Sequence, residues 1–209
     1  MSENWHKNLK NKNRRELIAA GKALFTEQGL SHVNIKDICE QADMSRVTFY
    51  KHFESIDELI FEVQMELMES MSEFVEVAGT DISSGKNKLR SMLMAWAEFA
   101  RRHPGYIKFI VSFDLQYSAY QSSPELVGRY KSFVKEKIKH HFLIDPLKAG
   151  IADQSLKPEL DPSETAQFIF VSMMGLLQRL SLSSTSSKDS LTPQRFIDML
   201  IEYMSNDHS

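Results

Sequence analysis

Apolar residues recur at helical spacing along most of this 209-residue chain, and no segment alternates convincingly at the period of a β-strand. One helix is predicted over about residues 14–25, ended by Gly29, and a short second helix has the inward residues Ile35, Ile38, Cys39 and Ala42. Further helices are predicted at 55–78, 86–102, 105–118, 124–142, 162–181 and 192–205. Loops are predicted at 79–85, 103–105, 121–124, 143–162 and 181–190, with room for one helical turn inside 143–162. The pattern is that of an all-α protein.

The run SRVTFYKHF, residues 45–53, follows the second helix after a turn at Asp43 and Met44, which is the layout of a helix-turn-helix. If Ser45 caps a helix and Phe49 faces the core, Val47 and Lys51 point away from it, at about 100° per residue. Thr48 and Tyr50 lie on the flanks, while within about 60° of the buried direction lie Ser45, Arg46, His52 and Phe53. Arg46 is long enough to reach round. A major groove can bind such outward groups, although similar short helices also occur on surfaces that bind no DNA.

Capping residues support the boundaries of the neighbouring helices. Asn34 is placed to accept a backbone hydrogen bond as the N-cap of the second helix. Ser55-Ile56-Asp57-Glu58 reads as a capping box in front of the apolar repeat Leu59, Ile60, Val63 and Leu67. A long helix is therefore expected to begin directly after the helix-turn-helix.

Between about residues 14 and 60 the sequence resembles the TetR family of bacterial transcription regulators. The matching elements are Arg14, Leu17, Ala20, Leu24, Phe25, Gly29, Ile38, the run 45–53 and Leu59. The rest of the chain matches in layout. The resemblance implies a helix-turn-helix DNA-binding domain at 1–54, joined by a long helix to an all-helical effector-binding and dimerisation domain at 55–209. It implies a DNA-binding transcriptional regulator.

The resemblance also implies which residues meet DNA. Arg46 and Lys51 are expected to read or approach bases, with Val47 offering an apolar contact. Phosphate contacts that set the register are expected from Arg14, Asn34, Thr48, Tyr50 and His52, and Ser45 completes the expected set.

Three positions depart from the family's pattern. Asn34 stands where Thr is usual, and both residues can cap a helix and touch a phosphate. Asp43 stands where Gly is usual, and aspartate tolerates a left-handed backbone at some cost. Ile56 replaces a common Lys and is followed by Asp57 and Glu58, which suit a helix N-terminus but repel DNA phosphate.

Composition fits a chain in two parts. At 42% hydrophobic, 25% charged and a net charge of −3, it is an ordinary globular protein. Residues 1–54 carry nine Lys and Arg against seven Asp and Glu, and the remainder sixteen against twenty-one. Many of the first group lie at residues 7–15, a segment that either reaches a neighbouring groove or is a solvated end.

The sequence also bears on compartment and on sulfur chemistry. No run approaches the roughly 20 apolar residues of a membrane span, and the N-terminus lacks the apolar core of a signal peptide, so we expect a cytoplasmic protein without a membrane partner. The single cysteine, Cys39, allows no disulfide and no cysteine-based metal site within one chain. It is expected to be a buried structural residue, since a redox sensor needs an exposed, activated thiolate. No cofactor or metal is expected.

The segment 166–180, AQFIFVSMMGLLQRL, is apolar nearly all round, so it needs packed neighbours on every side. One side is its own domain, and the other is most economically a second copy, reached with help from the last helix. The expected homodimer interface comprises Phe170, Met173, Met174, Gly175, Leu177, Phe196, Leu200 and Tyr203. In TetR-like proteins the last two long helices form the dimer. The alternative is a helix at the centre of one monomeric core.

Aromatic residues gather on the middle helices, where they form either an apolar pocket or a plain core. TetR-like proteins usually bind a small effector there. The candidate effector-binding residues are Trp96, Phe99, Phe109, Phe113, Tyr117, Tyr130 and Phe133. They favour a flat or hydrophobic molecule.

The resulting hypothesis is a homodimeric repressor that binds an inverted repeat in double-stranded DNA and is released by such an effector. The effector would tilt the helix that begins at Ser55 and change the separation of the two DNA-binding heads, whose half-sites lie about 34–36 Å apart. An activator or co-regulator controlled by a protein partner is the alternative. An enzyme is not expected, because the chain has no glycine-rich phosphate loop, no HExxH and no serine-centred elbow.

Overall fold

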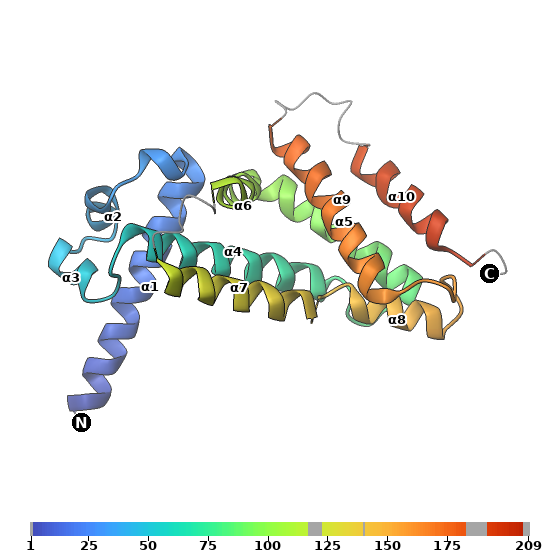
Figure 1. Cartoon of the computed structure of the whole chain (residues 1–209), viewed down its shortest axis with the longest axis horizontal. Helices are drawn as coiled ribbons and strands as arrows, with labels where there is room; N and C mark the ends of the chain where they lie inside the picture. The colour runs from blue at the N-terminus through green and yellow to red at the C-terminus, as the bar shows by residue number, and fades with distance from the viewer. Residues whose placement is uncertain (1, 117–122, 140, 183–191, 207–209) are drawn as a thin grey trace. The chain divides into compact units, whose positions relative to one another are not determined.

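A computed structural model describes residues 2–116, 123–139, 141–182 and 192–206 of the chain (Figure 1). Within this part of the chain there are ten α-helices and one 3-10 helix, and the only strand-like feature is an isolated bridge between Leu156 and Ser205. The elements are α1 (Ser2–Gln28), η1 (Leu30–His32), α2 (Ile35–Gln41), α3 (Arg46–Tyr50), α4 (Ile56–Val77), α5 (Gly85–Arg102), α6 (Pro104–Gln116), α7 (Pro124–Lys139), α8 (Ile144–Ala152), α9 (Pro162–Leu182) and α10 (Thr192–Met204). The all-α prediction is confirmed.

Two compact units divide the chain. Unit 1 comprises Met1–Met68 and Lys108–Lys131, and unit 2 comprises Glu69–Ile107 and Ser132–Ser209. Helices α4, α6 and α7 each contribute residues to both units. These units are defined by packing and not by DNA binding. The expected boundary of the DNA-binding domain at residue 54 therefore stays a prediction.

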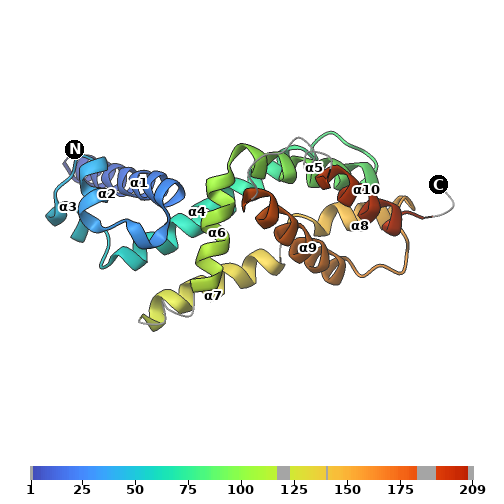
Figure 2. The ribbon, with the colours of Figure 1, turned by 90° about the horizontal axis from the view of Figure 1, so that it is seen from above.

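Unit 1 packs the first three helices against the start of α4. Leu17, Ile38, Phe49 and Leu59 are all fully buried, one from each of these helices. Gly21 lets α1 approach α4 closely, because a Cβ there would lie 2.9 Å from the Leu59 side chain. Figures 1 and 2 both show α2 beside α1 and α3 beside α2. The helix-turn-helix is therefore built on a shared apolar core.

The bounds of three elements differ from those predicted. Helix α1 begins at Ser2 rather than near Arg14, since no glycine or proline interrupts residues 2–13. The predicted recognition stretch 45–53 is helical only from Arg46 to Tyr50. Residues 144–152, expected in a loop with at most one helical turn, form the nine-residue helix α8.

Helix α8 is stabilised by its contact with α5 in unit 2. A Cβ at Gly85, the first residue of α5, would lie 1.9 Å from the backbone nitrogen of Gly150, so the two helices touch through bare backbone. The Asp153 carboxylate accepts a hydrogen bond from the Gly85 N–H at 2.7 Å. Bonds to this N–H and to Ser155 lower the pKa of Asp153, although desolvation acts in the opposite direction. Tertiary contacts of this kind leave no periodic signal in the sequence.

Trp96 of α5 lies at the centre of unit 2, fully buried, with its indole N–H directed at the Met71 sulfur at 3.0 Å. The rings of Phe142 and Phe170 lie 5.3 and 5.5 Å from it. Helix α5 contacts α8, α9 and α10, as both ribbon views show (Figures 1 and 2). No helix in the described residues is long and apolar enough to cross a membrane.

His141 packs at the edge of this aromatic group. Its ring stacks on Phe142 at 4.4 Å and meets Phe170 edge-on at 5.3 Å. Its Nδ1 accepts the Leu143 N–H at 3.2 Å, which leaves the proton on Nε2, a buried atom without a partner among the described residues. Burial lowers the pKa of His141 to about 4.

This lowered pKa predicts a loss of stability in acid. Well above pH 6.5, His141 is neutral in both the folded and the unfolded chain. Below pH 6.5, His141 binds a proton in the unfolded chain but stays neutral in the folded chain. Stability therefore falls as the pH drops from 6.5 towards 4, by about 2 kcal/mol at pH 5 from this group alone. We expect His141→Phe to reduce the stability difference between pH 7 and pH 5, measured by urea unfolding, by about that amount. An unchanged difference would contradict the buried neutral state.

Candidate nucleic-acid interface

The turn between α2 and α3 is fixed by local hydrogen bonds. Asn34 caps α2, its Oδ1 accepting the N–H groups of Lys36 at 2.8 Å and Asp37 at 3.3 Å, and Asp37 accepts the Asn34 N–H in return. Asp43 adopts a left-handed backbone with φ of 51°. The predicted capping role of Asn34 is confirmed, and Asp43 occupies the conformation for which glycine is usual.

Helix α3 has only five residues, and two phenylalanines hold it in place. Ser45 caps it by accepting the Thr48 N–H at 3.1 Å. Phe49 is fully buried and Phe53 is 1% exposed, with ring centroids 5.5 Å apart. Because these rings face inward, the opposite face of the helix is turned to solvent.

The outward face carries the groups expected to meet DNA. Val47 is 67% exposed and Tyr50 58%, and Arg46 and Lys51 are also exposed. Ser45 is exposed, and Thr48 and His52 are half-buried. Arg46 is more exposed to solvent than the helical projection predicted, because it is the first residue of α3.

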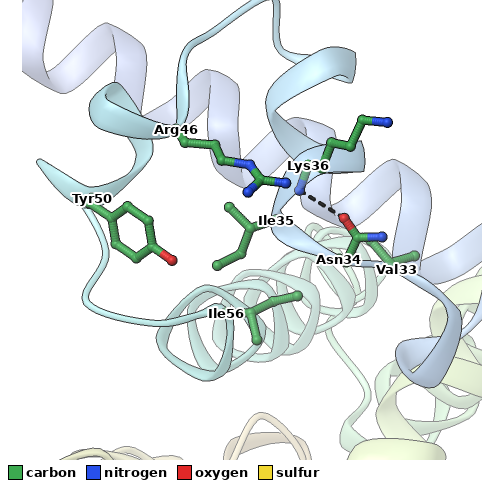
Figure 3. A pocket seen from close by; sticks show the side chains of 7 residues that line it. All are labelled: Val33, Asn34, Ile35, Lys36, Arg46, Tyr50 and Ile56. Atoms are coloured by element: carbon green, nitrogen blue, oxygen red, sulfur yellow. Dashed lines mark hydrogen bonds between the residues drawn. The ribbon is translucent and has the colours of Figure 1, made fainter.

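A cleft of about 620 Å³ lies beside this face, lined by Val33, Asn34, Ile35, Lys36, Arg46, Tyr50 and Ile56 (Figure 3). Arg46 and Tyr50 extend into it from α3, Asn34 stands on the other wall, and Ile35 and Ile56 lie between them. Its polar groups are a guanidinium, an ammonium, an amide and a phenol, which suit a phosphate backbone. Ile56, the apolar substitute for the family's common lysine, forms part of the wall.

Arg14, the other expected phosphate contact, is held inside unit 1. Its guanidinium lies 3.0 Å from a carboxylate oxygen of Glu62 and 4.8 Å from the centre of the Phe53 ring. It does not line the cleft. The structure thus places Arg14 behind α3, where it supports the helix.

Cys39 is 4% exposed on the inner side of α2. Burial raises the pKa of its thiol, and the positive charge of Arg46 only partly offsets this. These are the properties of an inert structural cysteine.

The candidate effector residues fall into separate groups. In unit 1, Phe113 and Tyr130 pack with Phe61 at centroid distances of 5.0–5.6 Å, and Phe109 lies 5.9 Å from Phe25. In unit 2, Trp96 and Phe99 are buried and Phe133 is half-buried. Tyr117 lies outside the described residues. Each group is a packed core in the structure.

Two polar residues of unit 1 escaped the sequence analysis. Gln64 is fully buried, donating from Nε2 to the Tyr130 hydroxyl at 3.3 Å, while its Oε1 has no partner among the described residues. The hydroxyl donates to Asp114 at 3.4 Å. Desolvation raises the pKa of Asp114, partly offset by this bond. A glutamine on the apolar stripe between Ile60 and Leu67 is the signal that would have revealed the group.

The expected dimer residues point in different directions. Met173 and Leu177 are fully buried within unit 2, so a partner cannot reach them without repacking. Phe170, Met174, Phe196 and Leu200 are half-buried. Gly175 is exposed, with nothing within 4 Å of an added Cβ, and Tyr203 is 72% exposed. The most exposed apolar residues also include Phe168 and Val171 of α9 and Met199 of α10.

An all-helical chain with a capped helix-turn-helix and an outward cationic and aromatic face defines a DNA-binding regulator. The family model of bacterial regulatory proteins, tetR family, matches residues 17–63. Over these residues the chain is therefore similar to the DNA-binding part of bacterial transcription regulators of the tetR family. Regulators of this family are not enzymes, which agrees with the expectation from the sequence.

Similar proteins cover most of the chain. The transcriptional repressor KstR2 of Mycolicibacterium smegmatis is 25% identical over 162 residues, which is 75% of this chain and 73% of that protein. The structure of the ketosteroid transcriptional regulator KstR2 of Mycobacterium tuberculosis has a TM-score of 0.64 at 20% identity, covering 93% of this chain and 95% of its own. FadR of Bacillus subtilis, in complex with stearoyl-CoA, has a TM-score of 0.69 at 19% identity, covering 90% and 97%.

Proposed function

We propose that two copies of this chain bind an inverted repeat in double-stranded DNA through α3 and are released by a small, largely apolar effector. The observation that carries the DNA-binding part is the outward face of α3, which joins Arg46, Val47, Tyr50 and Lys51 to a cleft lined by Asn34. Arg46 and Lys51 would approach bases, with Val47 against an apolar base edge. The phosphate backbone of the DNA would be held by Asn34, Ser45, Thr48, Tyr50 and His52. Arg14 would support α3 from inside unit 1.

Exposed apolar residues on the last two helices support the homodimer. Phe168 and Val171 of α9 and Met199 and Tyr203 of α10 are 62–72% exposed. Exposed apolar patches on such helices are characteristic of protein interfaces. One five-residue recognition helix reads a single half-site, and a two-fold dimer supplies the second.

The buried polar group Gln64–Tyr130–Asp114 supports an effector site in unit 1. The fully buried amide oxygen of Gln64, which has no partner in the described part of the chain, favours binding of a hydrogen-bond donor. The surrounding rings of Phe61 and Phe113 offer apolar walls. One structurally similar protein is called a ketosteroid transcriptional regulator and another is in complex with stearoyl-CoA, which agrees with an effector having a large apolar part.

The DNA-binding proposal predicts a specific loss of affinity. Selection from random duplexes should yield an inverted repeat, and Lys51→Ala or Arg46→Ala should weaken binding to it by about 5- to 150-fold, or roughly 1–3 kcal/mol, as for a lost bidentate base contact. Lys148→Ala, which removes an equal charge from an exposed position on α8, is the control. Unchanged affinity in both α3 variants would refute the proposed readout.

The dimer proposal predicts a change of mass in sedimentation experiments. The wild-type chain should sediment as a dimer at micromolar concentration, and Val171→Glu should give a monomer because it places a charge in an apolar interface. Gln194→Glu adds the same charge at an exposed position on α10 and should leave the dimer intact. A wild-type monomer would exclude the mechanism of two half-sites.

The effector proposal predicts a rise in melting temperature on ligand binding. Among acyl-CoA thioesters and steroid ketones, one class should stabilise the chain, by about 2.7 kcal/mol at a concentration 100 times its Kd. Tyr130→Phe keeps the ring but removes the hydroxyl bound to Gln64 and Asp114, so it should weaken this stabilisation. An identical shift in the variant would place the ligand elsewhere.

A further inference from the structure

Glu62 of α4 is shared by two arginines from helices far apart in the sequence. Its Oε1 lies 3.0 Å from Nη2 of Arg14 on α1 and 2.5 Å from Nη2 of Arg129 on α7. The Glu62 side chain is only 15% exposed, so these charges are partly shielded from solvent. One carboxylate therefore connects α1, α4 and the part of α7 that belongs to unit 1.

Each arginine leads from Glu62 to the helix-turn-helix. Arg14 lies over the ring of Phe53, which packs on Phe49 inside α3. Arg129 also lies 3.8 Å from Glu58, whose other oxygen accepts the Glu54 N–H at 2.8 Å. Arg129 thus contacts Glu62, which binds Arg14 behind α3, and Glu58, which caps the start of α4.

A second ion pair joins α1 to α4 in a different way. Lys22 binds Glu66, one helical turn after Glu62. Arg129 is not paired with Glu66. The Lys22–Glu66 pair is therefore a control for the Arg14–Glu62 pair. Both pairs join α1 to α4, but only Glu62 also binds Arg129 of α7.

The neighbour of Arg129 on α7 is Tyr130, whose hydroxyl bonds to Gln64 and Asp114. Because both residues lie on one helix, a change of partner at Tyr130 that displaces α7 also displaces the Arg129 guanidinium. Loss of Arg129 would leave Glu58 and Glu62, one helical turn apart, with Arg14 alone to offset two negative charges. Like charges at this spacing destabilise a helix.

We propose that Arg129 is a positioning residue for DNA binding, which holds α3 in place through Glu62, Arg14 and Phe53 and transmits displacements of α7 to it. The inference rests on the proposed function for its regulatory meaning. The mechanical link itself concerns described contacts within unit 1 and can be tested without DNA.

Cys39 provides the probe, because it is the single cysteine of the chain and is buried on α2 beside α3. Its reaction with a thiol reagent requires opening of these helices, so the rate reports their local stability. Arg129→Gln should raise the labelling rate about 1.5- to 5-fold, the range expected for loss of a partly exposed ion pair. Lys131→Gln, at an exposed position on the same helix, should leave it unchanged.

Double variants distinguish an effect of Arg129 that passes through Glu62 from a general loss of stability. In a Glu62→Gln background, Arg129→Gln should have a smaller effect, whereas in a Glu66→Gln background its effect should persist in full. Arg129→Lys should restore part of the wild-type rate. Repeating the labelling in low urea shows whether opening is local, since global unfolding responds strongly to denaturant.

An effect of Arg129→Gln no larger than that of Lys131→Gln, or equally large in both backgrounds, would overturn the proposal. A second measurement uses the selected duplex, to which Arg129→Gln should bind more weakly while Lys131→Gln binds normally. If no duplex is selected, the proposed DNA recognition fails, and the labelling experiment still decides whether the relay exists.

Discussion

The burial of Phe49 and Phe53 is the constraint on which the DNA-binding unit depends. A helix of five residues is far below the length at which helices are stable in water, so α3 depends on the burial of Phe49 within it and of Phe53 just after it. Fixing the rings also sets the direction of Val47, Tyr50 and Lys51. The same contact therefore folds the helix and determines what it presents to DNA, and Arg14 reinforces it from behind through the Phe53 ring.

Helix α4 links this contact to the rest of the chain because it carries residues of both units. Its first turns hold three kinds of partner: the apolar core through Leu59, the arginines through Glu62 and the buried tyrosine through Gln64. A fully buried glutamine costs stability unless its groups are bonded, and we propose a ligand at Gln64 because its Oε1 has no partner among the described residues. In the proposed mechanism, Gln64 at the ligand site and Glu62, which supports α3 through Arg14, lie only two residues apart on α4.

Local chemistry made part of this structure predictable from sequence. The capping roles of Asn34 and Ser45 and the inward direction of Phe49 follow from neighbours within a few residues, and the structure confirms them. Ser55 bonds forward to Glu58 as predicted, but Glu58 bonds back to Glu54. Helix α8 was missed because its stability comes from Gly85 and other distant residues. The directions of Met173 and Leu177 could not be read from a helix that is apolar on every side, since periodicity then carries no information.

Ile56, Asp57 and Glu58 at the start of α4 are unfavourable for DNA binding when only the sequence is considered. Contacts in the folded chain reduce this difficulty. Glu58 is engaged by the Glu54 N–H and faces Arg129, so its charge is partly offset. Ile56 itself lines the cleft, where the cations are Arg46 of α3 and Lys36 of α2, the latter paired with Glu40 at 3.5 Å. In the proposed complex with DNA, Arg46 across the cleft would supply the positive charge that the start of α4 lacks, and Arg129 would offset the negative charge of Glu58.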